Sequence, residues 1–309
     1  MKNTRYKRIE IVLVFIMFSV GAVRGSPLPY CMPPVNAFTA GIGGAAVAVT
    51  DDPSAIYWNP AAFAASELMQ VDFTVATPKL EMPASWSFLV ANSSVKGGGR
   101  FGLGAIRRSA EKPNGEKFRS FQVNIPISHA FSAGIVPVGV GLKFISENYG
   151  NAGWKSGMAV DAGAMLVLPT GFKIGYAVHN LIGSDLRAFP SMSWLGLSWG
   201  GGEFPILVAG QVRAERLRHR TYTTNNFNIG AEIAPVPSIP KIRIGWLRAK
   251  GEGRMTTGVS YKFKKENARL EYSLIVNPDD WNKTGHFITY SWGLKPPESV
   301  KGRRAGGWR

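Results

Sequence analysis

Residues 136–144 read Val-Pro-Val-Gly-Val-Gly-Leu-Lys-Phe, with an apolar side chain at every second position. Successive side chains of a β-strand point to opposite faces, so this stretch has one apolar face and one face of small or charged residues. The same alternation recurs along the chain after Met69, in segments separated by turn residues. The sequence therefore predicts an all-β protein beyond that residue.

The predicted strands are numerous and long. Many approach the roughly 9–11 residues that a tilted strand needs to cross a bilayer, whereas strands of soluble proteins are usually about 5–6 residues long. An even number of strands is also typical of an up-and-down membrane barrel. We predict 14 strands, at residues 69–77, 84–91, 100–109, 117–127, 135–146, 156–168, 170–180, 192–199, 205–216, 225–234, 239–248, 254–264, 268–276 and 285–294.

The residues between the apolar positions decide what kind of sheet this is. A soluble sandwich buries its apolar faces, whereas a membrane barrel turns them to lipid and lines its lumen with the polar faces. Alternation alone fits both, but strand length, strand number and aromatic residues near strand ends favour a transmembrane barrel. The polar positions include Lys143, Asp161, Lys173, Gln211, Arg213, Glu232, Arg243, Lys262 and Glu271.

The start of the chain has the layout of a secretory signal peptide. Four basic residues among the first eight precede an uncharged stretch at residues 11–23, and Gly25 is a small residue suited to a cleavage site. The alternative is a membrane anchor, but this apolar stretch is short against the roughly 20 residues of a helical span. We therefore predict a signal peptide at residues 1–25 and export to the outer membrane of a Gram-negative bacterium.

The chain is strongly basic. Its formal net charge is +16, and the predicted signal peptide holds five basic residues and one acidic residue, so the remainder carries +12. The basic residues are scattered singly along strands and turns, without a basic helix or a nucleic-acid motif. We therefore expect contacts with the phosphates of outer-membrane lipid and lipopolysaccharide, and no nucleic-acid partner.

The sequence contains no recognisable catalytic or metal-binding motif. The single cysteine, Cys31, excludes an intrachain disulfide, and the residues before it lack the small side chains that lipoprotein processing needs. The four histidines stand apart from one another, without a second ligand at metal spacing. Serine-hydrolase, zinc-protease and P-loop motifs are absent. We expect neither enzyme activity nor a cofactor.

Residues 26–66 differ from the rest of the chain, because they are rich in small residues and lack alternation. Asp52 precedes Pro53, and Asn59 precedes Pro60, which is the chemistry of a helix N-cap with proline at the first helical position. Two short helices are therefore predicted. Residues 41–46 match a loose dinucleotide-binding pattern, but no strand precedes them, so a packing role is favoured.

The N-terminal region also carries a family resemblance. Gly43-Gly44-Ala45 followed by residues 51–61, Asp-Asp-Pro-Ser-Ala-Ile-Tyr-Trp-Asn-Pro-Ala, resembles the signature of PorV/PorQ-type outer-membrane proteins, distant relatives of the FadL/TodX transporters of hydrophobic compounds. Weaker matches follow in the family's order at residues 160–164, 174–181, 229–232, 242–246, 270–273 and 286–292.

The resemblance implies a domain organisation. Residues 67–294 would form a 14-stranded barrel, and residues 26–66 would fold into its lumen as a hatch. The chain departs from the family after Leu294, where a tail containing Pro, Gly and Arg, residues 295–309, is expected to be disordered.

In such a hatch, acidic and amide side chains would hold local backbone amides, and aromatic side chains would pack against the barrel wall. The alternative is that some of these residues contact a passing ligand. The residues concerned are Asp51, Asp52, Tyr57, Trp58, Asn59 and Pro60.

The function that the resemblance implies is passive transport or binding of hydrophobic small molecules. Gly102 and Gly104, in the third predicted strand, are candidates for a gate because glycine weakens strand pairing. PorV-type members serve protein secretion, so capture of a secreted protein is an alternative function. A structural outer-membrane protein without transport is a third.

Overall fold

The fold is seen in a computed structural model that describes residues 34–49, 52–65, 70–78, 84–95, 99–111, 117–131, 135–149, 153–183, 191–200, 206–217, 220–234, 240–249, 252–263 and 267–293. The predicted signal peptide, Cys31, Asp51 and the tail at residues 295–309 lie outside the described residues.

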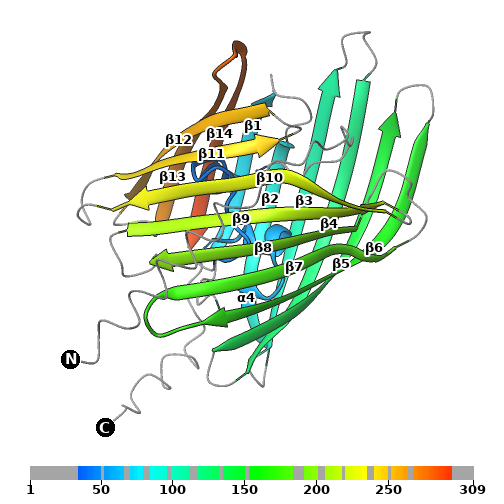
Figure 1. Ribbon diagram of the computed structural model, residues 1–309, viewed down its shortest axis with the longest axis vertical. Helices are drawn as coiled ribbons and strands as arrows, with labels where there is room; N and C mark the ends of the chain where they lie inside the picture. The colour runs from blue at the N-terminus through cyan, green and yellow to red at the C-terminus, as the bar shows by residue number, and fades with distance from the viewer. Residues whose placement is uncertain are drawn as a thin grey trace.

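Fourteen antiparallel strands close into a barrel in the order of the sequence, and β1 pairs with β14 at the seam (Figure 1). They are β1 (Gln70–Pro78), β2 (Ala84–Val95), β3 (Gly99–Glu111), β4 (Lys117–Phe131), β5 (Val136–Tyr149), β6 (Trp154–Val167), β7 (Phe172–Gly183), β8 (Ser191–Gly200), β9 (Ile206–Leu217), β10 (Arg220–Ile233), β11 (Lys241–Ala249), β12 (Glu252–Phe263), β13 (Ala268–Asn277) and β14 (Asp280–Gly293).

The predicted fold class, an all-β up-and-down barrel of 14 strands with a helical hatch in its lumen, is confirmed. The largest differences lie at strand ends. Strand β14 begins at Asp280, five residues before the predicted start at residue 285. Residues 280–284 read Asp-Trp-Asn-Lys-Thr, which lack the apolar alternation on which the prediction depends. Pairing of Asn277 with Asp280 extends the strand regardless of this composition.

The barrel wall is apolar outside and polar inside. In β1, Phe73 and Val75 are 48% and 46% exposed on the outer face, whereas Asp72 and Thr74 are fully buried on the inner face. This arrangement inverts that of a soluble protein and is typical of a membrane barrel. Other exposed outer residues include Ile127, Val140, Ile244, Met255, Ile288 and Trp292, and other buried inner residues include Gln122, Lys143, Asp161, Gln211, Arg243 and Glu271.

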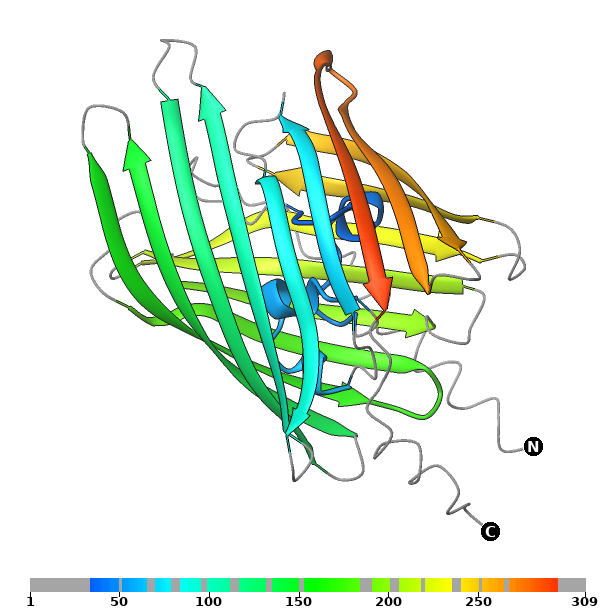
Figure 2. The same cartoon turned by 180° about the vertical axis from the view of Figure 1, so that it is seen from behind.

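Among the described residues, three short helices lie inside the barrel, α2 (Ala37–Gly41), α3 (Ala55–Trp58) and α4 (Ala62–Ala65) (Figure 2). The side chain of Asn36 caps α2 by accepting from the N–H of Thr39, and this helix was not predicted. In the described residues, no helix has both the length and the apolar character needed to cross a membrane.

Helices α3 and α4 correspond to the two predicted helices, but each begins two residues after its proline. Asp52 accepts from the N–H of Ser54 at 2.9 Å, and Asn59 accepts from the N–H of Ala61 at 3.0 Å. A side chain that binds the backbone two residues on forms a turn before the helix. The prolines therefore lie in these turns and not at the first helical position.

Candidate functional site

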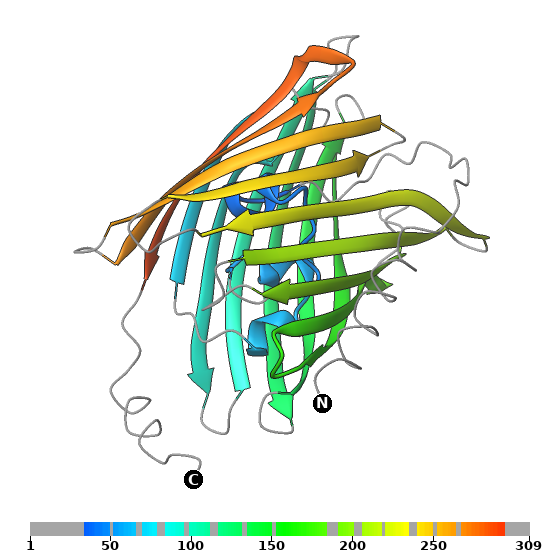
Figure 3. The same ribbon diagram turned by 60° about the vertical axis from the view of Figure 1, so that its left-hand side comes forward.

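The candidate site is the interface between the hatch and the inner wall (Figure 3). The described hatch has two parts, residues 34–49, here the first segment, and residues 52–65, here the second segment. Helix α2 of the first segment contacts β11 to β14, while α3 and α4 of the second segment lie against β3, β4 and neighbouring strands. The helices of the two segments thus face different parts of the wall.

The first segment is held through its backbone. Gln211 of β9 accepts from the N–H groups of Ala46 and Val47 at 2.9 and 3.0 Å, and its Nε2 donates to the carbonyl of Gly44 at 2.6 Å. A buried peptide group without a partner is costly, so these wall side chains replace the partners that regular structure would supply.

The same kind of bond recurs on six more strands, always between a wall side chain and a backbone group of the first segment. The wall residues are Ser87 of β2, Ser198 of β8, Asn228 of β10, Thr256 of β12, Ser273 of β13 and Thr289 of β14.

Inward-facing glycines let the hatch backbone approach the wall closely. A Cβ at Gly139 of β5 would lie 2.5 Å from the carbonyl carbon of Pro60, and one at Gly245 of β11 would lie 2.5 Å from the nitrogen of Gly43. A Cβ at Gly230 would likewise clash with the backbone of Ile42. The glycine seat, as we call it, consists of Gly139, Gly163, Gly175, Gly196, Gly230, Gly245 and Gly258.

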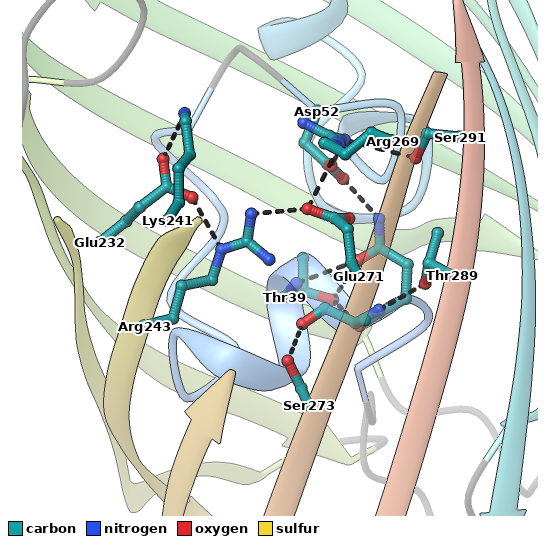
Figure 4. Close-up of polar contacts among 12 residues, drawn as sticks. Thr39, Asp52, Glu232, Lys241, Arg243, Arg269, Glu271, Ser273, Thr289 and Ser291 are labelled. Carbon is teal, nitrogen blue, oxygen red and sulfur yellow. Dashed lines mark hydrogen bonds and ion pairs between the residues drawn. The ribbon is translucent and has the colours of Figure 1, made fainter. Parts of the chain in front are cut away.

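A charged cluster joins the strands β10 to β13 to the hatch (Figure 4). Arg243 lies between two carboxylates, donating from Nε to Glu232 at 2.7 Å and from Nη2 to Glu271 at 2.6 Å. Lys241 also contacts Glu232, at 2.7 Å. Arg269 approaches Glu271 at 3.2 Å and reaches the hatch carboxylate Asp52 at 3.4 Å. Buried charges need such partners, because desolvation otherwise makes them costly.

Asp52 connects both hatch segments to the wall. Its Oδ1 accepts from Nδ2 of Asn36 at 2.7 Å, and the same Nδ2 lies 3.2 Å from the Asp72 carboxylate of β1. Burial raises the pKa of the Asp52 carboxyl, and the positive charge of Arg269 opposes that rise. Arg269 therefore favours the charged form of Asp52 most, and the hydrogen bonds from Ser54 and Asn36 act on its pKa in the same direction.

The second segment is held mainly by its aromatic pair. The hydroxyl of Tyr57 accepts from Nη2 of Arg108 at 2.7 Å. Trp58 is fully buried and meets Trp194 of β8 edge to face, with ring centroids 5.7 Å apart. Its backbone carbonyl accepts from Nε2 of His179 at 3.1 Å.

His179 is part of a second buried group of charges. Its Nδ1 lies 3.1 Å from Asp161, which also contacts Nζ of Lys143 at 2.8 Å. Asp161 accepts as well from the backbone N–H of Asn180, whose φ of 55° falls where the β6–β7 register shifts. In the described part of the chain, no group of three or more His, Cys, Asp or Glu residues could hold a metal ion.

The wall opposite the second segment is polar but poorly paired. Four inward side chains of β4, namely Ser120, Gln122, Asn124 and Ser128, are at most 4% exposed. Each keeps one buried polar atom that has no hydrogen-bond partner among the described residues. The helices nearby have the apolar sequences Ala-Ile-Tyr-Trp and Ala-Phe-Ala-Ala. An unpaired buried polar group costs about 1–3 kcal/mol, so this contact is weak.

The structure brings the described site residues predicted from sequence into one interface. Asp52 and Asn59 hold local amides as expected, and Tyr57 and Trp58 contact the wall. Asn59 also donates to the carbonyl of Val47 at 2.8 Å, which links the two segments. Contact of any of these residues with a ligand stays a prediction, as does every role of Asp51.

Both predicted gate glycines lie on β3, at positions that face the lumen. Gly102 pairs with Ala91 of β2. A Cβ at Gly104 would meet Cγ2 of Ile56 in α3 at 3.2 Å, so Gly104 lies directly beneath the second segment. Their role in gating stays a prediction.

Sequence reasoning missed several residues of the interface. Asn36, Asp72, His179 and Arg269 were not among the candidate residues, and His179 stands alone in the sequence. The alternation of β13 alone could have predicted that Arg269 faces the lumen, because it shares the inner face of that strand with Glu271.

Comparison with solved structures identifies the same fold in outer-membrane channels. A deletion mutant of the monoaromatic hydrocarbon channel TodX matches with a TM-score of 0.60 and 12% identity, over 88% of this chain and 100% of that one. A Pseudomonas aeruginosa FadL homologue has a TM-score of 0.58 and 12% identity, covering 85% and 98%. The monoaromatic hydrocarbon channel CymD has a TM-score of 0.57 and 13% identity, covering 84% and 97%.

No protein-family model and no curated protein sequence matches the chain. Identities of 12–13% show a shared fold and nothing finer. The resemblance to PorV/PorQ-type proteins therefore stays a prediction.

Replacing Gly139 by alanine should loosen the hatch. The added methyl meets backbone atoms of Pro60 and Ala61, and such overpacking costs about 1–3 kcal/mol. Gly141 is the matched control, since it faces inward on the same strand and its nearest neighbour would be Cβ of Asp161 at 3.6 Å. Thermal unfolding of the detergent-solubilised barrel should show a lower transition for Gly139→Ala alone. Equal transitions for both variants would contradict the glycine seat.

Replacing Asp161 by asparagine should destabilise the barrel strongly. The change leaves the ammonium of Lys143, which is 1% exposed, without its carboxylate, and loss of one partner of a buried pair costs about 3–5 kcal/mol. Ser128→Ala removes a hydroxyl that has no partner among the described residues, so little change is expected. Urea unfolding in detergent measures both. A similar loss in the two variants would show that the charge pairing is unimportant.

Proposed function

We propose that this protein is an outer-membrane channel for hydrophobic small molecules, closed in the described conformation by its hatch. The observation that carries the proposal is a closed 14-stranded barrel, apolar outside, whose lumen holds a buried N-terminal segment. The outer face suits lipid, and an occupied lumen excludes free diffusion of water-soluble solutes. Structures with the same fold are described as channels for monoaromatic hydrocarbons.

Opening requires part of the hatch to move, and the bonding favours the second segment. The first segment has backbone bonds to side chains on strands from β8 to β14 and on β2, and its departure would break all of them. The second segment covers unpaired polar groups of β4, which water or a ligand could pair once α3 and α4 withdraw. Its described hydrogen bonds to wall side chains are fewer than those of the first segment, and they come from Arg108, His179 and Arg269. Its displacement therefore costs less free energy.

The path opened in this way has two kinds of wall. Leu89 of β2 and Ile106 of β3 are fully buried and apolar, and they adjoin the polar inner face of β4. The β3–β4 ladder is interrupted here, since it pairs Phe101 with Ile127 and next Gly104 with Asn124. Gly102 lies within the interruption, opposite Pro126, which has no N–H to donate. This supports the two glycines of β3 as the place where a passing ligand leaves the lumen.

The first test is reconstitution. The purified chain should migrate differently on a gel before and after boiling, as a folded membrane barrel does, and it should need detergent for extraction. In vesicles with lipopolysaccharide in the outer leaflet, it should speed entry of a hydrophobic fluorescent tracer over that into empty vesicles. Solubility without detergent would overturn the membrane location. Folded protein without faster entry, particularly if a secreted protein copurifies, would favour an interaction protein.

Disulfide cross-links test which of the two hatch segments moves. Ile56→Cys with Gly104→Cys joins α3 to β3, because a Cβ at position 104 lies 3.2 Å from Cγ2 of Ile56. Val47→Cys with Gly196→Cys joins the first segment to β8 across a Cβ–Cβ distance of 3.2 Å. The second distance is close to the roughly 3.5–4.5 Å between the Cβ atoms of a disulfide. In the first pair, Cγ2 of Ile56 lies at a position that Sγ of a cysteine can take. Cys31→Ser removes the native thiol.

Oxidation of the first pair should abolish tracer entry, and reduction should restore it. Oxidation of the second pair should leave entry unchanged. Loss of entry with both pairs would mean that the whole hatch moves, and loss with neither would mean that the hatch is not the gate.

A further inference from the structure

The outer surface of the barrel has two unlike ends. We call the end that contains Gln70 and Gly293 the near end and the opposite end the far end. At the near end most outward side chains are apolar, with Phe131, Trp199, Ile242, Tyr261 and Trp292 all more than a third exposed, and His129 beside Phe131 is an exception. Among the described side chains, no lysine or arginine points outward there.

Outward arginines occur at the far end. Arg107 of β3 and Arg119 of β4 are both exposed and have outward parity. Arg107 pairs with Phe121, and the next outward-facing pair toward the rim is Ser109 with Arg119. The two arginines are thus diagonal neighbours on adjacent strands, about 7–8 Å apart at the backbone. Their long side chains can reach one common ligand.

The surroundings place these arginines at the border of the apolar band. Toward the middle of the barrel lie Phe121, which is 40% exposed, and Leu103, which is 37% exposed. Across β5, Asn148 pairs with both Arg119 and the 57% exposed Trp154. Tryptophan is enriched where membrane meets water, at the depth of the lipid headgroups. The two guanidinium groups therefore lie at headgroup depth and not in the hydrocarbon.

We propose that Arg107 and Arg119 form a binding site for a phosphate group of a membrane lipid. Guanidinium binds phosphate through paired N–H donors, which gives it an advantage over ammonium. The hydroxyls of Ser146 and Ser156, which share a hydrogen bond of 2.8 Å on the same outer surface, add polar groups at this level. The phosphate comes from lipid A of lipopolysaccharide or from a glycerophospholipid. The site rests on the proposed membrane location but not on transport.

The site also orients the barrel. Among the described side chains, outward-facing cations occur only at the far end, and a barrel of this kind is held with that end at the more anionic surface. If the lipid is lipid A, the far end faces outward from the cell and the chain ends of the barrel face the periplasm.

Native mass spectrometry of the detergent-solubilised full chain tests the site. Lipid A with two phosphates, dephosphorylated lipid A and phosphatidylglycerol are added in turn. Arg107→Gln with Arg119→Gln should weaken binding of a phosphate-bearing lipid at least about tenfold, since each basic residue near an anionic surface contributes roughly a fivefold effect. Arg107→Lys with Arg119→Lys should recover part of the affinity. Lys262→Gln, at an exposed near-end lysine of inner parity, is the matched control and should change nothing.

Preference for lipid A or for phosphatidylglycerol identifies the source of the phosphate. Equal binding of dephosphorylated lipid A, unchanged binding by the glutamine pair, or an equal loss in Lys262→Gln would each overturn the site. Heat-modifiability of the glutamine pair checks that it folds. Because tracer entry is measured separately, failure of transport leaves the result for lipid binding intact.

Discussion

Buried peptide groups must be paired, and this requirement shapes the protein from the wall to the hatch. Strands satisfy one another around the closed barrel, so the wall has no free edge. The first hatch segment, in contrast, is mostly irregular and has no strand beside it. Part of its pairing comes from bonds within the segment, such as that from the N–H of Gly44 to the carbonyl of Thr39. The rest comes from single inward side chains such as Gln211 and Thr256, spread over many strands. The hatch is thereby held without being part of the sheet.

Close approach is what makes this pairing possible. Short side chains such as serine and threonine reach a backbone only if that backbone lies near the wall, and glycine beside them provides the space. Ser273 and Gly258 illustrate the point, since they are paired across β12 and β13 and both contact the hatch near Gly41. On β4 this combination of a polar side chain and a nearby backbone group is missing, because the polar side chains face apolar helices there. The hatch is therefore firmly bound on one side and loosely bound on the other.

The sequence was sufficient to predict where the strands lie and which of their residues face inward. Lys143, Asp161 and Arg243 were placed on the polar parity, because strand geometry repeats every two residues. The sequence was not sufficient to predict which residues these side chains bind. Asp161 meets His179 because β6 and β7 pair in one particular register, and alternation within a single strand does not specify that register. Helix α2 was missed because Asn36 precedes it without the proline that marked the other two turns.

The long sequence separation of the hatch bonds has a consequence for how the chain folds. Ala37 bonds to Thr289 across 252 positions, and Ala37 and Gly41 bond to β13 and β12 across 236 and 215. The N-terminal part of the described chain therefore cannot reach its final conformation until the last strands have formed. Contacts of such separation slow folding, because a large loop must close before they form. Seam closure between β1 and β14 and docking of the hatch are thus expected to be one late, shared step of assembly.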